Sequence, residues 1–420
     1  MRSWLMEEDA AVRTRTLSEI ATAVEGDVDR AARVLACVSI WDPVEEARGE
    51  LAVPDAGVRV LCALPADYDP TAGPFPLVIC LPPARAAPAS FLDTVASRLA
   101  TNGGGAAIWI AVGGQADGMF PADPAKAGTF ALILREAMSA FHIDAAAVYL
   151  VGSGEGADAA FSLALAYPDS FAGLGAIGGY ARVPLPEYAY SLLSENLGSL
   201  AIASAWWLAD ADDPGAIADL TRRDLFIAAH NRALRSLAAT ALPRFDGAEV
   251  NAAPAAWNHV AGALRRWLVT PPPKADPRTA RGWIRFPQHG RIGWLEAEAI
   301  DEPIWTSQQL TVAVGDPGGG DAFVRGVLEG RLAHLAGRID GQEITIDAHR
   351  CLRVGILLRR GLIDFTRPIR VTCNGILRYD GPVERRLTTM METARRDLDF
   401  SNPAWARLSF RMDGPALQRD

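Results

Sequence analysis

The residues from Val148 to Ser170 combine two apolar runs around a cluster of glycines, in the order VYLVGSGEGADAAFSLALAYPDS. This order predicts a strand, a sharp turn and a helix. A turn of this kind, written G-x-S-x-G, holds a serine nucleophile at its tip for attack on a carbonyl carbon. Here the middle position is a glycine without a side chain, and the five residues are Gly152, Ser153, Gly154, Glu155 and Gly156. In this frame the turn therefore lacks its nucleophile.

Ser153 is the alternative nucleophile. In its own frame the turn would need small residues at Val151 and Glu155, and neither of these is small. A turn slipped by one residue would therefore be strained. In the frame centred on Gly154, Ser153 is only a small polar residue of the turn, and both interpretations stay open on the sequence.

The stretches around this turn predict the scaffold that must position it. From Leu51 onward, apolar runs alternate with helical stretches; the runs include GVRVLCALP, PLVICLPP, AAIWIAVGG, FAGLGAIGG and LAIASAWWLAD. Several runs are apolar at consecutive positions, which is typical of strands buried on both faces. Alternating strand and helix predicts an α/β fold, a mostly parallel sheet with helices on both faces. The last predicted helix is AAWNHVAGALRRWLV.

The chain divides into four predicted segments. Residues 1–50 form a short helical segment, in which Thr16 and Glu19 read as a capping box and Asp27 as a second helix cap. We expect this segment to pack on the domain that follows it, at 51–270. Residues 271–282 are a proline-rich linker.

The last segment, 283–420, predicts a mostly β domain that resembles a sandwich. Short alternating segments follow one another there, and Asn374-Gly375 between two of them predicts a hairpin. Three tryptophans are candidates for carbohydrate stacking or, more simply, for core packing: Trp283, Trp294 and Trp305.

Composition excludes several classes of partner. The chain of 420 residues has 50 acidic and 41 basic side chains, a net charge of −9, which argues against a nucleic-acid or membrane partner. The five cysteines show no C-x-x-C spacing, so neither a disulfide framework nor a zinc site is expected. Early acids at Glu7 and Glu8, and the lack of an 18-residue uncharged run, predict a cytoplasmic protein. No cofactor is expected.

Several motifs in order carry a family resemblance. YDPTAGPFPLVICLPP, FHIDAAAVYLVGSGEGADAAFSLALAYPDSFAGLGAIGG and DADDP together resemble the α/β-hydrolase family. More narrowly, they are similar to its esterase and peptidase branch, which includes polyhydroxybutyrate-depolymerase-like and feruloyl-esterase-like enzymes. The likeness runs roughly from Val58 to Thr270. The later stretch LIDFTRPIRVTCNGILRYDGPV is similar to a C-terminal extension found on some bacterial members.

The resemblance implies an α/β-hydrolase fold and a catalytic triad with an oxyanion hole. The nucleophile position falls on Gly154. A backbone N–H of Glu155 would serve as one oxyanion donor, while the other donor loop carries Pro82 and Pro83, and proline has no N–H to donate.

The other two triad positions are equally informative. The histidine is expected near Pro254, and the nearest one is His259, inside the last predicted helix. The acid falls on Asp212 by spacing, or on Asp213, although D-D-P is also ordinary turn chemistry.

Three functional hypotheses follow. The first is a degenerate hydrolase, or pseudo-enzyme, that binds an unknown small molecule or protein. The second is an active esterase or peptidase that uses Ser153 with Asp212 and His259. The third is a metal site formed at the crevice by acids of two loops, namely Glu155, Asp158, Asp210, Asp212 and Asp213.

Overall fold

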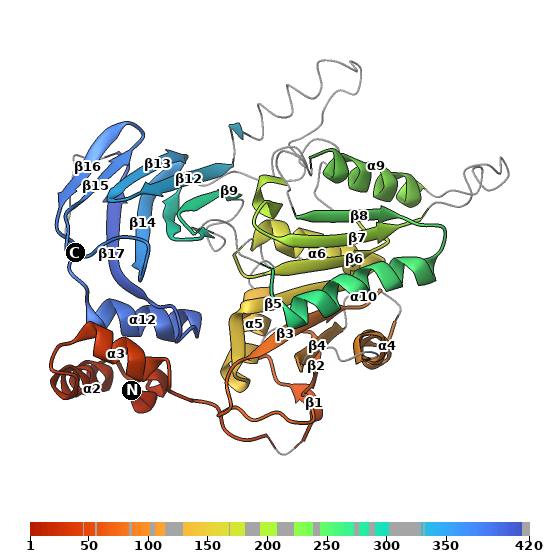
Figure 1. Cartoon of the computed structure of the whole chain (residues 1–420), viewed down its shortest axis with the longest axis horizontal. Helices are drawn as coiled ribbons and strands as arrows, with labels where there is room; N and C mark the ends of the chain where they lie inside the picture. Colours follow the sequence, from red (N-terminus) through yellow and green to blue (C-terminus); the bar gives the residue numbers. More distant parts are fainter. Residues whose placement is uncertain are drawn as a thin grey trace.

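The computed structural model describes most of the chain, and Figure 1 shows its arrangement. The described residues are 1–44, 46–54, 57–83, 86–100, 106–113, 129–167, 169–180, 194–207, 222–237, 244–272, 277–284, 290–301, 329–330 and 332–413. A large central sheet with flanking helices lies beside two smaller sheets, and a layer of helices from the N-terminus lies beneath the smaller sheets in this view (Figure 1).

The central sheet has eight strands in the order β1-β2-β4-β3-β5-β6-β7-β8. The pairs β1–β2 and β2–β4 are antiparallel, and the remaining pairs are parallel. This order confirms the expected α/β-hydrolase fold. The strand bounds are β1 Arg48–Leu51, β2 Arg59–Ala63, β3 Phe75–Leu81, β4 Ile108–Gly113, β5 Ile143–Ser153, β6 Gly173–Ile177, β7 Ala201–Trp206 and β8 Phe245–Glu249.

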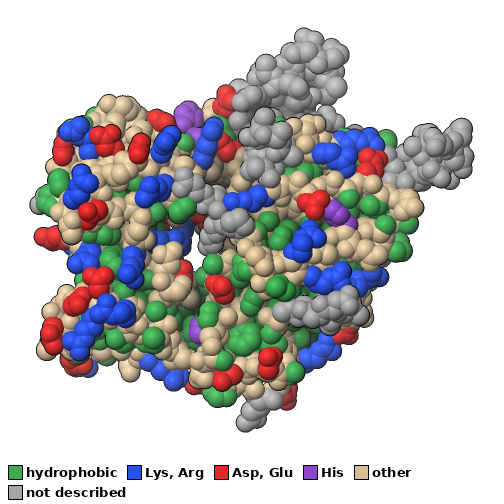
Figure 2. Space-filling model, viewed as in Figure 1, with side chains coloured by type: hydrophobic (Ala, Val, Ile, Leu, Met, Phe, Trp, Pro, Cys, Tyr) green, Lys and Arg blue, Asp and Glu red, His purple; other side chains and the backbone are tan. Residues whose placement is uncertain are grey.

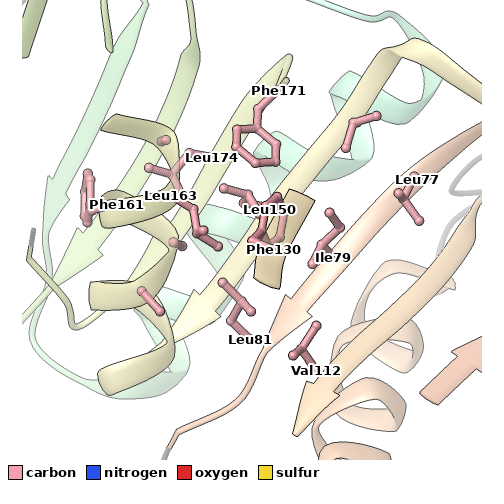
Figure 3. Packing of buried hydrophobic residues seen from close by; sticks show 14 of the residues in the cluster. Leu77, Ile79, Leu81, Val112, Phe130, Leu150, Phe161, Leu163, Phe171 and Leu174 are labelled. Carbon is pink, nitrogen blue, oxygen red and sulfur yellow. The ribbon is translucent and has the colours of Figure 1, made fainter. Parts of the chain in front are cut away.

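Consecutive apolar residues in the central strands serve two separate cores. In β3, Leu77 and Ile79 belong to the core on one face, while Val78 and Cys80 belong to the core on the other. Helices α5 (Thr129–Ala140) and α6 (Glu155–Ala166) contribute to the first core, part of which Figure 3 shows. Helices α4 (Pro88–Ala100) and α10 (Ala253–Val269) contribute to the second. Because both faces are covered, these strands need no polar alternation.

The C-terminal part is a sandwich of two sheets around one apolar core, as expected. One sheet has the order β10-β11-β14-β17 and the other β16-β15-β13-β12-β9. The strands are β9 Thr279–Ile284, β10 Arg291–Ile292, β11 Leu295–Ile300, β12 Ala333–Asp340, β13 Glu343–His349, β14 Cys351–Arg359, β15 Ile369–Cys373, β16 Ile376–Gly381 and β17 Ala404–Arg411.

Local features of the sandwich match most of the sequence expectations. Asn374 and Gly375 turn between β15 and β16 with φ of +49° and +75°, as a tight hairpin requires. Trp294 is buried in the sandwich core, Trp283 is half-buried, and Trp305 lies outside the described residues. Strand β9 already begins at Thr279, so the extended spacer is shorter than the predicted 271–282.

The N-terminal helices are α1 (Arg2–Met6), α2 (Ala10–Ala23) and α3 (Val28–Leu35). They pack mainly on α12 (Leu387–Asp397) of the C-terminal part, not on the domain that follows them in sequence, so that expectation was wrong. The apolar faces of α12 and of these helices cover one another.

Side-chain caps decide where these N-terminal helices start. Asp27 caps α3, as predicted. Helix α2 is capped by Asp9, whose carboxylate accepts from the N–H groups of Ala11 and Val12. The predicted capping-box residue Thr16 therefore lies inside the helix.

A short 3-10 helix, η1 (Ser194–Leu197), joins the central-sheet domain to the sandwich. The buried Asn196 side chain donates to Leu165 O at 2.7 Å and to Trp283 O at 2.8 Å, and accepts from Trp283 N at 2.7 Å. The neighbouring Glu195 pairs with Arg281 and, at 2.9 Å, with His334. Within the described part of the chain, no helix has the length and apolarity that crossing a membrane demands.

Candidate functional site

The turn between β5 and α6 forms the centre of the candidate site. Gly154 stands between the last residue of β5 and the first of α6, with φ of +57° and ψ of −125°. Its N–H donates to Ile177 O at 2.9 Å, and its carbonyl accepts from Ala157 N at 3.0 Å and Asp158 N at 3.2 Å. The tip of the turn is thus held by the neighbouring strand and by the helix that follows. Residues other than glycine rarely adopt this backbone conformation. Where they do, the strained residue often belongs to a functional site.

Two flanking glycines allow the helix and strand to meet. A Cβ on Gly156 would lie 2.7 Å from Pro82 O, and one on Gly152 would lie 2.6 Å from Ala157 N, both closer than such atoms can approach. The backbone of α6 therefore lies directly against the ends of β3 and β5. This is the close packing that the G-x-S-x-G pattern requires at its first and last positions.

Gly154 itself is not enclosed in this way. A Cβ there would meet only Pro83 Cβ, at 3.7 Å, an ordinary van der Waals contact. There is room for a Cβ at the tip, so crowding at that atom does not explain the glycine. The positive φ is the feature that favours glycine here.

The loop after β3 begins with Pro82 and Pro83, which lie beside the turn. An oxyanion hole needs N–H donors aimed at the developing charge, and these two residues have none. Glu155, the other predicted donor, is the first residue of α6. The two sides of the predicted oxyanion hole are therefore adjacent, but the loop on one side begins with two prolines that cannot donate.

Of the remaining triad candidates that the structure describes, Ser153 adjoins the turn and His259 lies apart from it. Ser153 is half-buried at the end of β5 and pairs with Ile177. His259 lies on α10, where its Nε2 is 3.2 Å from the carbonyl oxygen of Asp246 and 3.5 Å from its carboxylate. Asp246 belongs to β8, three strands from β5. At about 4.8 Å per strand this is about 14 Å, too far for a serine–histidine hydrogen bond.

The acidic candidates divide into two groups. Asp210, Asp212 and Asp213 lie outside the described residues. Asp158 is fully buried in the first turn of α6, where its carboxylate accepts from Tyr180 N at 2.9 Å. Across the described ranges no three His, Cys, Asp or Glu side chains gather closely enough to hold a metal ion.

Sequence reasoning missed a helix that borders the site. Helix α9 (Arg222–Leu237) places Asn231 and His230 in the interior. Asn231 accepts from Ser204 Oγ of β7 at 2.5 Å and donates to Gly179 O after β6 at 3.0 Å. The helical spacing of Ile227, His230 and Leu234, all buried, is the signal that could have revealed this helix.

His230 is buried against α6. Its ring meets the Phe161 ring edge-on, with centroids 4.9 Å apart. Burial lowers the pKa of His230 from 6.5 to about 3, because the charged imidazolium would lose its hydration. The imidazole is therefore neutral at physiological pH. A neighbouring indole, Trp206, is also fully buried and lies under the guanidinium of Arg235 at 4.8 Å.

The surface around these elements carries mixed charge. In the view of Figure 2, basic and acidic side chains are interspersed over the central-sheet domain and the sandwich. A continuous basic field, which a nucleic-acid partner would require, does not stand out on this face.

Comparison with known proteins gives structural matches only. No protein-family model matches the chain, and no curated protein matches it. Similar solved structures include a thermostable esterase, with 17% identity and a TM-score of 0.38 over 53% of this chain and 62% of the esterase. An uncharacterised protein from Capnocytophaga ochracea has 16% identity and a TM-score of 0.39 over 54% of this chain and 64% of its own. This chain thus spans less than two thirds of each.

Two shorter neighbours are matched over more of their length. S-formylglutathione hydrolase from Staphylococcus aureus has 12% identity and a TM-score of 0.39 over 54% of this chain and 99% of that one. A poly(3-hydroxybutyrate) depolymerase from Bordetella parapertussis has 16% identity and a TM-score of 0.36 over 52% and 85%, respectively. In every case the match covers about half of this chain.

Proposed function

We propose that this chain is a catalytically degenerate hydrolase-fold protein, which acts by binding a small molecule or a protein rather than by hydrolysis. The observation that carries the proposal is Gly154, which has the strained backbone of a nucleophile tip, φ +57° and ψ −125°, and no side chain. Nucleophilic catalysis needs an activated oxygen or sulfur at that tip and a base within hydrogen-bond reach. The proline loop at Pro82 and Pro83 supports the same conclusion, because it removes an oxyanion donor.

The nature of a ligand at this turn follows from the charges around it. The N-terminus of α6 by itself favours an anion. Glu155 and Asp158, both in the first turn of α6, oppose that preference. We therefore infer a neutral or weakly cationic ligand.

The first prediction separates this proposal from the active alternative, a serine hydrolase that uses Ser153 with Asp212 and His259. The purified protein is incubated with a fluorophosphonate probe and, separately, with a simple aryl ester. We expect neither labelling nor turnover above that of the Ser153→Ala variant, because the hydroxyl of Ser153 lies about three strands from His259.

An active esterase of known activity serves as the positive control for both reagents. Labelling that Ser153→Ala abolishes, together with ester turnover, would establish the alternative and end the pseudo-enzyme proposal. The Gly154→Ala variant leaves the hydroxyl of Ser153 in place and controls for changes in the turn itself.

A further inference from the structure

The segment between the N-terminal helices and the central sheet contains one deeply buried contact. Trp41 is 5% exposed, and its indole N–H donates to Met138 O at 2.8 Å. Its ring stacks on His142, with centroids 4.0 Å apart and planes at 12°. Met138 belongs to α5 and His142 directly precedes β5, so both partners belong to the central-sheet domain.

The other side of Trp41 faces the sandwich part of the chain. Its ring lies 5.5 Å from that of Phe400, just after α12. It shares an apolar cluster with Met390, Met391 and Trp405. One side chain therefore contacts both the central-sheet domain and the layer that covers the sandwich.

The layer of α1–α3 is itself fastened to the C-terminal part. Arg395 of α12 donates to Leu5 O and to Glu7 O, each at 3.1 Å, and Arg385 pairs with Asp29 of α3. Arg2 pairs with Asp42 at 2.7 Å, which ties the segment after α3 back to the layer. The two ends of the chain thus build one module, and the central-sheet domain is an insertion within it.

From these contacts we propose that residues 36–44 are a strap, pinned by Trp41, that locks the inserted central-sheet domain to the module built from both chain ends. The sandwich itself contacts the central-sheet domain around η1, through Asn196, through the pairs of Glu195 with Arg281 and His334, and through Asp169, which accepts from Gly293 N. Trp41 adds a further attachment, on α5 and the start of β5, that comes from the N-terminal segment instead of the sandwich. The two parts should therefore open together rather than separately.

The second prediction tests the strap by hydrogen exchange in increasing denaturant, comparing peptides from α5 and α12. In the natural protein we expect both helices to lose protection at the same denaturant concentration. In Trp41→Ala the two helices should lose protection at different denaturant concentrations, and calorimetry should resolve two transitions instead of one.

The matched control is Trp4→Ala, which removes another buried tryptophan from the same helical layer. Trp4 is 3% exposed, and its indole N–H donates to Arg13 O, so this hydrogen bond stays within the N-terminal segment. Trp4→Ala should lower stability but keep the two losses coincident.

A second route guards against a variant that does not fold. His142→Ala removes the stacking partner from the central-sheet side and leaves the helical layer intact. A double-mutant cycle with Trp41→Phe should give a coupling of roughly 2- to 10-fold in the unfolding equilibrium, as stacked aromatic pairs do. Coincident transitions in Trp41→Ala and His142→Ala, with no coupling between positions 41 and 142, would overturn the proposal.

Discussion

Replacing Gly156 with alanine is expected to lower the free energy of unfolding by at least about 3 kcal/mol, a large effect for a single methyl group. The new Cβ would lie 2.6 Å from Leu81 C and 2.7 Å from Pro82 O. Both atoms belong to backbone at the end of β3, so no flexible side chain can move aside. Helix α6 would have to shift away from the sheet, and its contacts with the core of Leu81, Ala160 and Phe161 would loosen. Urea unfolding monitored by circular dichroism measures the change.

Gly262 provides the matched control for this substitution. It lies within α10, where a Cβ would meet only the guanidinium of Arg266, at 3.7 Å. Gly262→Ala should therefore stabilise the protein by about 0.5–1 kcal/mol, the usual helix preference for alanine over glycine. If Gly156→Ala proved as harmless as Gly262→Ala, the close contact of α6 with β3 would be wrong, and with it the assignment of Gly154 to the tip.

Acidification from pH 6.5 to pH 4.5 is expected to cost the protein about 2–3 kcal/mol of stability through His230 alone. Burial lowers the pKa of His230 from 6.5 to about 3 in the folded protein. In that window the unfolded chain takes up a proton at this position and the folded chain does not, so stability falls as the pH falls. The contribution is intact above pH 6.5 and levels off below about pH 3.

His230→Phe keeps an aromatic ring against Phe161 and removes the titration, so it should flatten this part of the pH profile. His142, whose pKa burial also lowers, accounts for a remaining slope. Asp397 has a lowered pKa as well, but a carboxyl in the unfolded chain titrates only near its ordinary pKa of about 3.9, so most of its effect lies below this window. An equally steep profile in His230→Phe would show that the imidazole is hydrated or charged in the fold.

The sequence by itself determined the character of the central domain. Runs such as PLVICL are apolar at every position because Leu77 and Ile79 serve one core while Val78 and Cys80 serve the other, a pattern that only a doubly covered strand needs. Glycine spacing identified the turn as well, since Gly152 and Gly156 are required wherever a helix starts so close to a strand. The Asn374-Gly375 hairpin could also be predicted from the sequence, because Asn and Gly by themselves favour the two positive φ angles that its turn requires.

Tertiary structure alone decided which elements share a surface. The helices before residue 36 have apolar faces that many partners could cover, and only the fold shows that α12, more than 350 positions later, is the one. Thr16 and Glu19 met the local rule for a cap, yet α2 begins at Ala10, because the carboxylate of Asp9 already caps it there.

The candidate site shows the same division between local pattern and distant contact. Sequence spacing could offer His259 and Ser153 as partners, but not reveal that α10 directs this histidine to Asp246 on the edge strand. The spacing of two residues in the sequence predicts their distance only when both lie in one helix or strand. The distance between a serine and a histidine on different elements depends instead on the order of the strands in the sheet. The five residues from Gly152 to Gly156 were enough to predict a turn without a nucleophile, whereas the separation of that turn from His259 is seen only in the folded chain.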